Sequence, residues 1–550
     1  MFWSRLTIAG ANMRAKVLNI SIAVLVTIAS LGSTAIAAAT AKEGKPASKE
    51  AAKQSAQESS KDSAKDLAKD LAKDLAKDDE IKLPSFPSDK TIHQSMLLSG
   101  HPLKYDATVG SLPILDVKGK TIAHVMFTAY TVAGVDRPVT FALNGGPGAS
   151  SVFLNLGALG PKRVQFGADG NSPSDPAVPV DNAGTWLDFT DLVFIDPVGT
   201  GFSYTDAKEE EAKQRFYNPK ADVEYLSRII FDWLVKNERL TARKYLVGES
   251  YGGFRAPRIT HFLQTRLGVA MNGIVLVSPY LDPNASGNGD LSPLPWMLTL
   301  PSIAAANLER HGKLSDATMA EIINYTRTDY VSDLLKGRSD PSAVERIVKR
   351  VVELSGLDPT FVRYSGGRLE TQAYLREVFR AEGKLGSRYD SNVTSWDPFP
   401  YSPNQRTNDP LLDGIIAPTT TAMVDFVTHT VGWKYAARYN ALSYEVNQLW
   451  SDAEDRGEKD EVLGGTQRGS VEALRQSVAV DPKLNALIVH GWGDLSCPFM
   501  ASVLIVDQMP IMGNPARVQV KEYPGGHMFY SRGASQLALR NDVMKMYAVH

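Results

Sequence analysis

The fold is decided by residues 245–253, which read YLVGESYGG. The apolar residues 245–247 predict a buried strand, and the next five residues fit the pattern G-x-S-x-G around Ser250. Flanking glycines allow a strand to turn sharply into a helix, which lifts the serine hydroxyl above the sheet. The amphipathic stretch 254–267 supplies that helix. The pattern alone is weak evidence, because chance turns also match it. The strand before it and the helix after it favour a nucleophile at Ser250.

Other apolar runs alternate with helical stretches along the chain. Buried strands are expected at 138–143, 191–196, 274–278, 484–490 and 518–523, and a helix at 221–237. This alternation predicts a mostly parallel central sheet covered by helices. Between residue 110 and about residue 134, alternating segments such as 122–127 predict antiparallel strands at a sheet edge.

The strand–helix rhythm stops between about residues 282 and 480. Helical stretches at 315–324 and 341–354 follow one another there without strands. We interpret this part as a large, mainly helical cap insertion over the active site, where it would shape the pocket for the substrate side chain.

The last two predicted strands each end in a glycine-marked loop that contains one candidate side chain. These candidates are Asp494 and His527. Loops at the carboxyl ends of parallel strands meet at one edge of the sheet, so the distance in sequence is no objection. A lone Asp or His in a loop is more often a cap or core residue. The order Ser250, Asp494, His527 after the expected strands favours a catalytic triad, with the three residues as nucleophile, orienting acid and base.

A glycine-rich loop follows the strand at 138–143 and reads NGGPGASS over residues 144–151. Such a loop could cradle phosphate, but this one lacks the P-loop lysine and the spacing of a dinucleotide site. In a serine hydrolase, the same position supplies backbone N–H groups to the oxyanion.

Three sequence blocks, in this order, resemble the serine carboxypeptidase family: NGGPGASS at 144–151, GTGFSY at 199–204 and GESYGG at 248–253. Asp494-x-x-Cys497 and Gly526-His527-Met528 are similar to two further blocks of that family. The resemblance covers most of residues 100–550 apart from the middle. It implies an enzyme with an α/β-hydrolase fold that removes residues from peptide or protein C-termini. The resemblance implies no cofactor and no metal.

The resemblance also implies roles for residues beyond the triad. The N–H groups of Gly146 and Tyr251 would form the oxyanion hole. Asn144, Gly145 and Glu249 would bind the terminal carboxylate of the substrate. Two carboxyl groups share a hydrogen bond only if one keeps its proton, so Glu249 needs a raised pKa and acidic pH is favoured. The plain alternative is that Glu249 only fills the variable position of the turn.

The chain departs from the family pattern at three alanines. Ala142 stands where the family has Trp, and Ala158 where it has the Glu that partners the recognition glutamate. Both losses weaken the expected carboxylate site, so an esterase or acyltransferase of the same fold is the alternative function. Ala149 replaces a family cysteine, and with Cys497 as the sole cysteine the family's disulfides are absent.

Two further functions are disfavoured by particular residues. A prolyl aminopeptidase would have His where Asn144 stands. A binding protein on an inactive hydrolase scaffold would not need the serine, aspartate, histidine and both glycine loops that this chain keeps.

Residues 1–39 resemble a bacterial-type signal peptide, with early positive charges, an apolar run and an A-x-A site at 35–37. This predicts export to the periplasm or medium and no stable membrane insertion after cleavage; an uncleaved anchor is the alternative. Residues 40–83 are an Ala/Lys/Asp-rich tether, disordered or partly helical, with a partner-binding helix as the alternative. The hydrolase domain is then expected in two parts, 84–281 and 481–550, around the insertion 282–480.

Composition excludes several other classes of function. The 59 Lys and Arg residues nearly balance 61 Asp and Glu residues, so no field favours nucleic acid. The nine histidines form no metal-binding motif. No particular oligomeric state is predicted.

Overall fold

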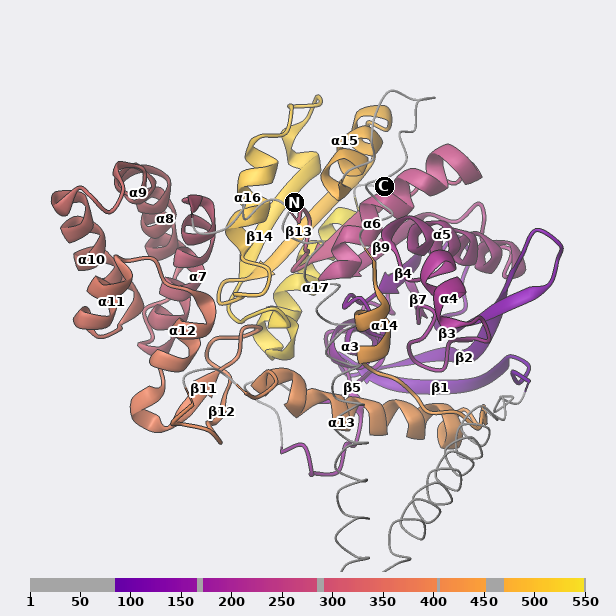
Figure 1. Cartoon of the computed structure of the whole chain (residues 1–550). Coiled ribbons are helices and arrows are strands. Elements are labelled where there is room, and N and C mark those ends of the chain that lie inside the picture. The colour runs from indigo at the N-terminus through magenta and orange to yellow at the C-terminus, as the bar shows by residue number, and fades with distance from the viewer. Residues whose placement is uncertain (1–84, 166–171, 284–290, 403–405, 452–468, 549–550) are drawn as a thin grey trace, which may run out of the picture. The chain divides into compact units, whose positions relative to one another are not determined.

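The computed structural model describes residues 85–165, 172–283, 291–402, 406–451 and 469–548 (Figure 1). The predicted signal peptide 1–39 and tether 40–83 lie outside the described residues. All described residues belong to one compact unit, Leu83–His550. None of the helices in these described residues has the length and apolarity of a membrane span.

A mixed sheet forms the centre of this unit, with the strand order β1-β2-β3-β7-β4-β9-β10-β13-β14 and β8 beside β3. Pairing is antiparallel from β1 to β7 and parallel from β7 to β14. The strands are β1 (Lys90–Leu98), β2 (His101–Leu115), β3 (Thr121–Thr131), β4 (Val139–Leu143), β7 (Asp191–Ile195), β8 (Tyr204–Thr205), β9 (Lys244–Glu249), β10 (Gly273–Val277), β13 (Asn485–Gly491) and β14 (Val518–Tyr523). The predicted mostly parallel sheet is confirmed.

Both faces of the sheet are buried by helices, and successive strand residues point to opposite sides. Phe141 and Leu246 belong to one hydrophobic cluster, whereas their neighbours Ala142 and Val247 belong to the other. The first cluster is covered by α4 (Glu209–Arg215), α5 (Pro219–Lys236), α6 (Tyr251–Phe262) with η3 (Leu263–Leu267), and α15 (Ser470–Val480). The second is covered by α3 (Val152–Leu154) with η1 (Asn155–Leu159), α13 (Pro410–Asp425) with η7 (Phe426–Thr430), η10 (Phe529–Ser531) and α17 (Gly533–Ala548).

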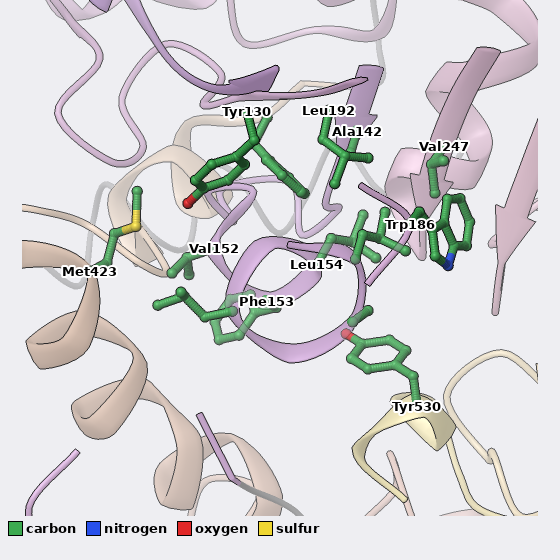
Figure 2. Close-up of a cluster of buried hydrophobic side chains, with 14 of the residues drawn as sticks. Tyr130, Ala142, Val152, Phe153, Leu154, Trp186, Leu192, Val247, Met423 and Tyr530 are labelled. Atoms are coloured by element: carbon green, nitrogen blue, oxygen red, sulfur yellow. The ribbon is translucent and has the colours of Figure 1, made fainter. Parts of the chain in front are cut away.

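The second cluster is drawn in Figure 2, where Ala142, Leu192 and Val247 point from the sheet toward Trp186 and the turn that carries Leu154. Ala142, at the position of the family's Trp, is fully buried there. Tyr130 and Trp186 fill the same cluster with large rings. The core therefore closes on this face without a tryptophan at position 142.

Between β10 and β13 the described residues add no strand to the main sheet. This part contains α7 (Leu294–Arg310), α8 (Asp316–Tyr325), η5 (Thr326–Tyr330), α9 (Val331–Lys336), α10 (Pro341–Ser355), α11 (Pro359–Ser365), α12 (Thr371–Glu377), η6 (Arg380–Glu382), β11 (Lys384–Gly386), β12 (Thr394–Trp396), α13, η7, α14 (Tyr444–Leu449) and α15. The group α7–α12 has its own hydrophobic core and lies next to α16 (Phe499–Asp507) in Figure 1. By contrast, α15 packs against α6 on the sheet. The insertion boundaries 282 and 480 stay a prediction.

A buried ion pair joins α5 to α6 below the serine turn. The Arg255 Nε atom lies 2.5 Å from Asp222 Oδ2, and both side chains are 1% exposed. Arg255 Nη1 also donates to the Asn144 carbonyl oxygen at 2.8 Å. One guanidinium thus holds two helices and the glycine-rich loop after β4 together.

We predict that Asp222→Ala lowers the free energy of unfolding by about 3–5 kcal/mol, because Arg255 would keep a buried charge without its partner. Thermal or urea unfolding measures this change. Glu345→Ala is the matched control, since the pair of Glu345 with Arg363 is well exposed and such pairs add little stability. A loss in Asp222→Ala as small as in the control would contradict this role.

Candidate active site

Ser250 lies on a sharp turn between β9 and α6. Its φ of 58° and ψ of −121° are a conformation that side chains rarely adopt. The Ser250 N–H donates to the Val277 carbonyl oxygen and the Ser250 carbonyl accepts from Tyr280 N–H, each at 3.0 Å. A Cβ atom on Gly248 would overlap the Gly252 carbonyl oxygen. The two glycines of G-x-S-x-G are therefore required by close backbone contact, and Ser250 is left partly exposed.

His527 and Asp494 form a buried hydrogen-bonded pair at the ends of neighbouring strands. His527 Nδ1 lies 2.7 Å from Asp494 Oδ2. The other oxygen, Asp494 Oδ1, accepts backbone N–H groups from Ser496 at 2.8 Å and Cys497 at 2.9 Å. With the carboxylate fixed in this way, the proton stays on Nδ1 and Nε2 is the acceptor of the imidazole.

The environment of His527 changes its pKa in two directions. Burial lowers the pKa, but the negative charge and hydrogen bond of Asp494 outweigh burial and leave the pKa raised. The ring also meets Tyr389 edge to face, with centroids 5.2 Å apart. The histidine is thereby oriented and is a stronger base than a free imidazole.

Ser250 and His527 line the same cavity, of about 210 Å³. Its wall also contains Asn144, Gly145, Gly146 and Glu249 from the two glycine loops. The cavity is also lined by residues from α13, α14 and the chain between them: Leu412, Leu442, Tyr444 and Asn447. A cavity of about 880 Å³ beside β1 and β2 contains neither Ser250 nor His527.

The glycine loop after β4 approaches the serine turn through its backbone. A Cβ atom on Gly145 would lie 2.5 Å from the Tyr251 nitrogen and 2.8 Å from the Glu249 carbonyl oxygen. Gly146 has a φ of 103°, in the region that favours glycine. Gly145, Gly146 and Tyr251 are therefore brought to one place, as an oxyanion hole requires.

Asn144 and Glu249 form a buried polar pair beside Ser250. The Leu154 N–H donates to Asn144 Oδ1 at 2.9 Å, so the amide nitrogen faces the other way. That nitrogen, Nδ2, donates to Glu249 Oε2 at 2.6 Å. Burial raises the pKa of Glu249 to about 7, against the charge of His527 and the hydrogen bonds from Tyr530 and Asn144.

Tyr530 is a residue of this site that the sequence reasoning missed. Its hydroxyl lies 2.9 Å from Glu249 Oε1 and 2.8 Å from Oε2. The only signal in the sequence is a tyrosine three residues after His527. The turn η10, which carries Tyr530, packs against η1, which carries Ala158.

One group of side chains among the described residues has the spacing of metal ligands: Asp494, Cys497 and His527, whose ligand atoms lie within 4.8 Å of one another. Two of the three, Asp494 and His527, form the hydrogen-bonded pair in which Asp494 orients the imidazole. An ion held there would occupy the atoms of the Asp494–His527 hydrogen bond, so we interpret the group as part of the predicted triad.

A little under half of the chain is similar to a known protein family. A family model described as serine carboxypeptidase matches residues 105–354. The matched residues include the glycine loop and the Ser250 turn. Asp494 and His527 lie outside the matched residues, in the loops that follow β13 and β14 of the same sheet.

Members of the serine carboxypeptidase family similar to this chain come from yeast and plants. The pheromone-processing carboxypeptidase KEX1 of Saccharomyces cerevisiae is 31% identical over 212 residues, which are 36% of this chain and 27% of the relative. Serine carboxypeptidase-like 40 of Arabidopsis thaliana is 29% identical over 163 residues, 29% of this chain and 30% of the relative. The chain thus matches about a quarter to a third of the length of these relatives.

A solved structure of a yeast carboxypeptidase has a similar fold. The prohormone-processing carboxypeptidase KEX1(ΔP) from Saccharomyces cerevisiae aligns with a TM-score of 0.50 and 17% identity, over 80% of this chain and 91% of that chain. This likeness confirms the α/β-hydrolase fold that the resemblance implied.

We predict that Gly145→Ala abolishes reaction of the protein with a fluorophosphonate probe, because the added Cβ pushes the glycine loop away from Tyr251 N. The measurement is labelling of the folded protein, checked by circular dichroism. Gly414→Ala in α13 is the matched control, since a Cβ there meets no atom within 4 Å and alanine favours helix. Full labelling of folded Gly145→Ala would show that this close approach is not needed.

Proposed function

We propose that this chain is a serine carboxypeptidase, which removes residues one at a time from the C-termini of peptides or proteins. The observation on which this proposal rests is the buried Asn144–Glu249 pair, 2.6 Å apart, in the wall of the cavity that contains Ser250 and His527. A hydrogen-bonding group for a terminal carboxylate, placed beside a nucleophile, is what separates an exopeptidase from other serine hydrolases. The similar yeast and plant proteins, a carboxypeptidase and a serine carboxypeptidase-like protein, agree with this activity.

Carboxylate recognition in this proposal needs no cation. The second hydrogen on Asn144 Nδ2, the N–H of Gly145 and the proton of Glu249 are the donors for the substrate's terminal carboxylate. An ionised Glu249 would repel that carboxylate. With a pKa of about 7, Glu249 keeps its proton below neutral pH and loses it above. Binding of free C-termini should therefore weaken as the pH rises through 7.

The reaction follows from the positions of the other groups. Ser250 Oγ attacks the carbonyl carbon of the last peptide bond while His527 Nε2 takes its proton. The oxyanion forms next to the N–H groups of Gly146 and Tyr251, which is worth about 3–4 kcal/mol of transition-state stabilisation. His527 then gives the proton to the leaving amine, and water hydrolyses the acyl-enzyme on Ser250 by the same route.

The proposed site of action is outside the cytoplasm. The apolar run and A-x-A site within residues 1–39 support cleavage and release to the periplasm or the medium. The fold does not depend on disulfides, because Cys497 is buried and free. Residues 282–480 are proposed to act as the cap that limits access to the cavity.

The test of this function compares peptides as free acids with the same peptides as C-terminal amides, at about pH 5 and about pH 7.5, on either side of the Glu249 titration. Mass spectrometry should show stepwise loss of C-terminal residues from the free acids, faster at the lower pH and much slower from the amides. Ser250→Ala is the control and should be inactive. Cleavage of a small ester without any trimming would instead support the esterase or acyltransferase alternative, in which Ala142 and Ala158 have cost the carboxylate site its function.

We further predict that Asp494→Asn lowers kcat about 10⁴-fold for peptide and ester substrates alike, because the amide no longer holds His527 in the reactive tautomer. Steady-state kinetics on both substrates measure the change. Ser496→Ala keeps the backbone N–H that Asp494 accepts and should keep kcat. A loss below tenfold in Asp494→Asn would rule out the proposed triad.

A further inference from the structure

The Tyr530 hydroxyl is buried with Glu249 in the interior of the protein. It reaches both carboxyl oxygens of Glu249, at 2.9 and 2.8 Å, and the tyrosine ring belongs to the hydrophobic cluster of Figure 2. The ring is fully buried, as is the Glu249 side chain apart from 1%. The turn η10 is held in place because the Arg163 guanidinium donates to the carbonyl oxygens of Tyr530 and Ser531. The Tyr530 hydroxyl is therefore kept beside Glu249.

The partners of Glu249 determine which of its oxygens can carry a proton. Asn144 Nδ2 can only donate, and its orientation is fixed by the bond from Leu154 N–H to Oδ1. Oε2 is therefore an acceptor in every state of the carboxyl group. When Glu249 is protonated, the hydrogen must be on Oε1, and the Tyr530 hydroxyl is then able to turn its own hydrogen to Oε2.

We propose that Tyr530 is a positioning residue that holds Glu249 against Asn144 and keeps Oε1 as the oxygen that presents the proton to the substrate's C-terminal carboxylate. This inference rests on the proposed function. It assigns the second partner of Glu249 to a phenol from the turn after His527, whereas the family resemblance implies a glutamate partner at position 158, which is alanine here.

A phenol differs from a carboxyl group in how it titrates. Burial and the neighbouring Glu249 charge raise the pKa of Tyr530 well above its usual value, so the hydroxyl stays neutral throughout the range in which the enzyme would work. The other charged groups that act on Glu249 are His527, which lowers its pKa, and Asp494, which raises it. Tyr530 favours the ionised form of Glu249 by hydrogen bonding, and thereby sets how far into neutral pH the proton is kept.

The test is Tyr530→Phe, which removes the hydroxyl and keeps the ring. Loss of a donor to the ionised carboxylate should raise the pKa of Glu249 by about one unit. The alkaline limb of kcat/KM for a free-acid peptide should move up by the same amount, through KM, while kcat for a small ester stays within about twofold. Infrared titration of the Glu249 carboxylic C=O band in the substrate-free protein should show the same shift.

Two variants make this result interpretable. Glu249→Gln cannot titrate, so it should remove both the alkaline limb and the infrared band, and adding Tyr530→Phe to it should cause no further pH shift. Tyr523→Phe is the matched control, because the Tyr523 hydroxyl also donates to a carboxylate, Asp542 at 2.9 Å, but outside the cavity. It should shift neither the limb nor the band.

Three outcomes would overturn the inference. An unchanged limb and band in Tyr530→Phe would show that the hydroxyl does not act on Glu249. An equal loss of kcat on peptide and ester, with no pH shift, would mean that Tyr530 only supports the fold. If the wild-type protein cleaves the ester but no free-acid peptide, the proposed function fails and the carboxylate role fails with it, while the infrared titration still reports separately whether Tyr530 controls the protonation of Glu249.

Discussion

The close approach of two backbone turns is the constraint on which the rest of the site depends. The strands β4 and β9 are parallel neighbours, with Leu143 opposite Gly248, so the loops that follow them leave the sheet side by side. Only a residue without a side chain fits at Gly145, against Tyr251 N. Arg255 holds the Asn144 carbonyl from below while paired with Asp222. The reacting groups are thus placed mainly by backbone contacts between adjacent strands, and side chains are added to that frame.

Much of this frame could be predicted from the sequence, and its limits are physical. Most of the parallel strands are short apolar runs buried on both faces, so their local pattern is sufficient; β14, at the sheet edge, is only partly buried. The loops after these strands contain the residues of the proposed triad. The edge strand β1 was not predicted. Its inward side alternates along the strand, but polar Gln94 interrupts the apolar series of Ile92, Met96 and Leu98. Tyr530 was missed for another reason: its hydrogen-bond partner lies 281 residues away, and no local pattern encodes such a contact.

The surroundings of Glu249 show how a polar network can change its members. From the sequence, Ala158 counts only as the loss of a partner for Glu249. In the structure, the turn η10 lies against η1 and supplies the Tyr530 hydroxyl to the same carboxyl group. A buried carboxyl group needs its hydrogen bonds satisfied, whichever element provides them. A missing family residue is therefore weak evidence for lost function until the surrounding donors are known.

The helical group α7–α12 completes its core with residues that lie far along the chain. Trp492, Leu495, Phe499 and Met500, which follow β13, pack into the same cluster as Leu298 and Ile347. During synthesis, the helices leave the ribosome well before these residues, so their apolar faces stay uncovered until the last part of the chain arrives. Chains that end before Trp492 keep this hydrophobic surface exposed, and exposed hydrophobic surface promotes aggregation. The order of translation thus couples the maturation of the helical group to that of the final two strands of the sheet.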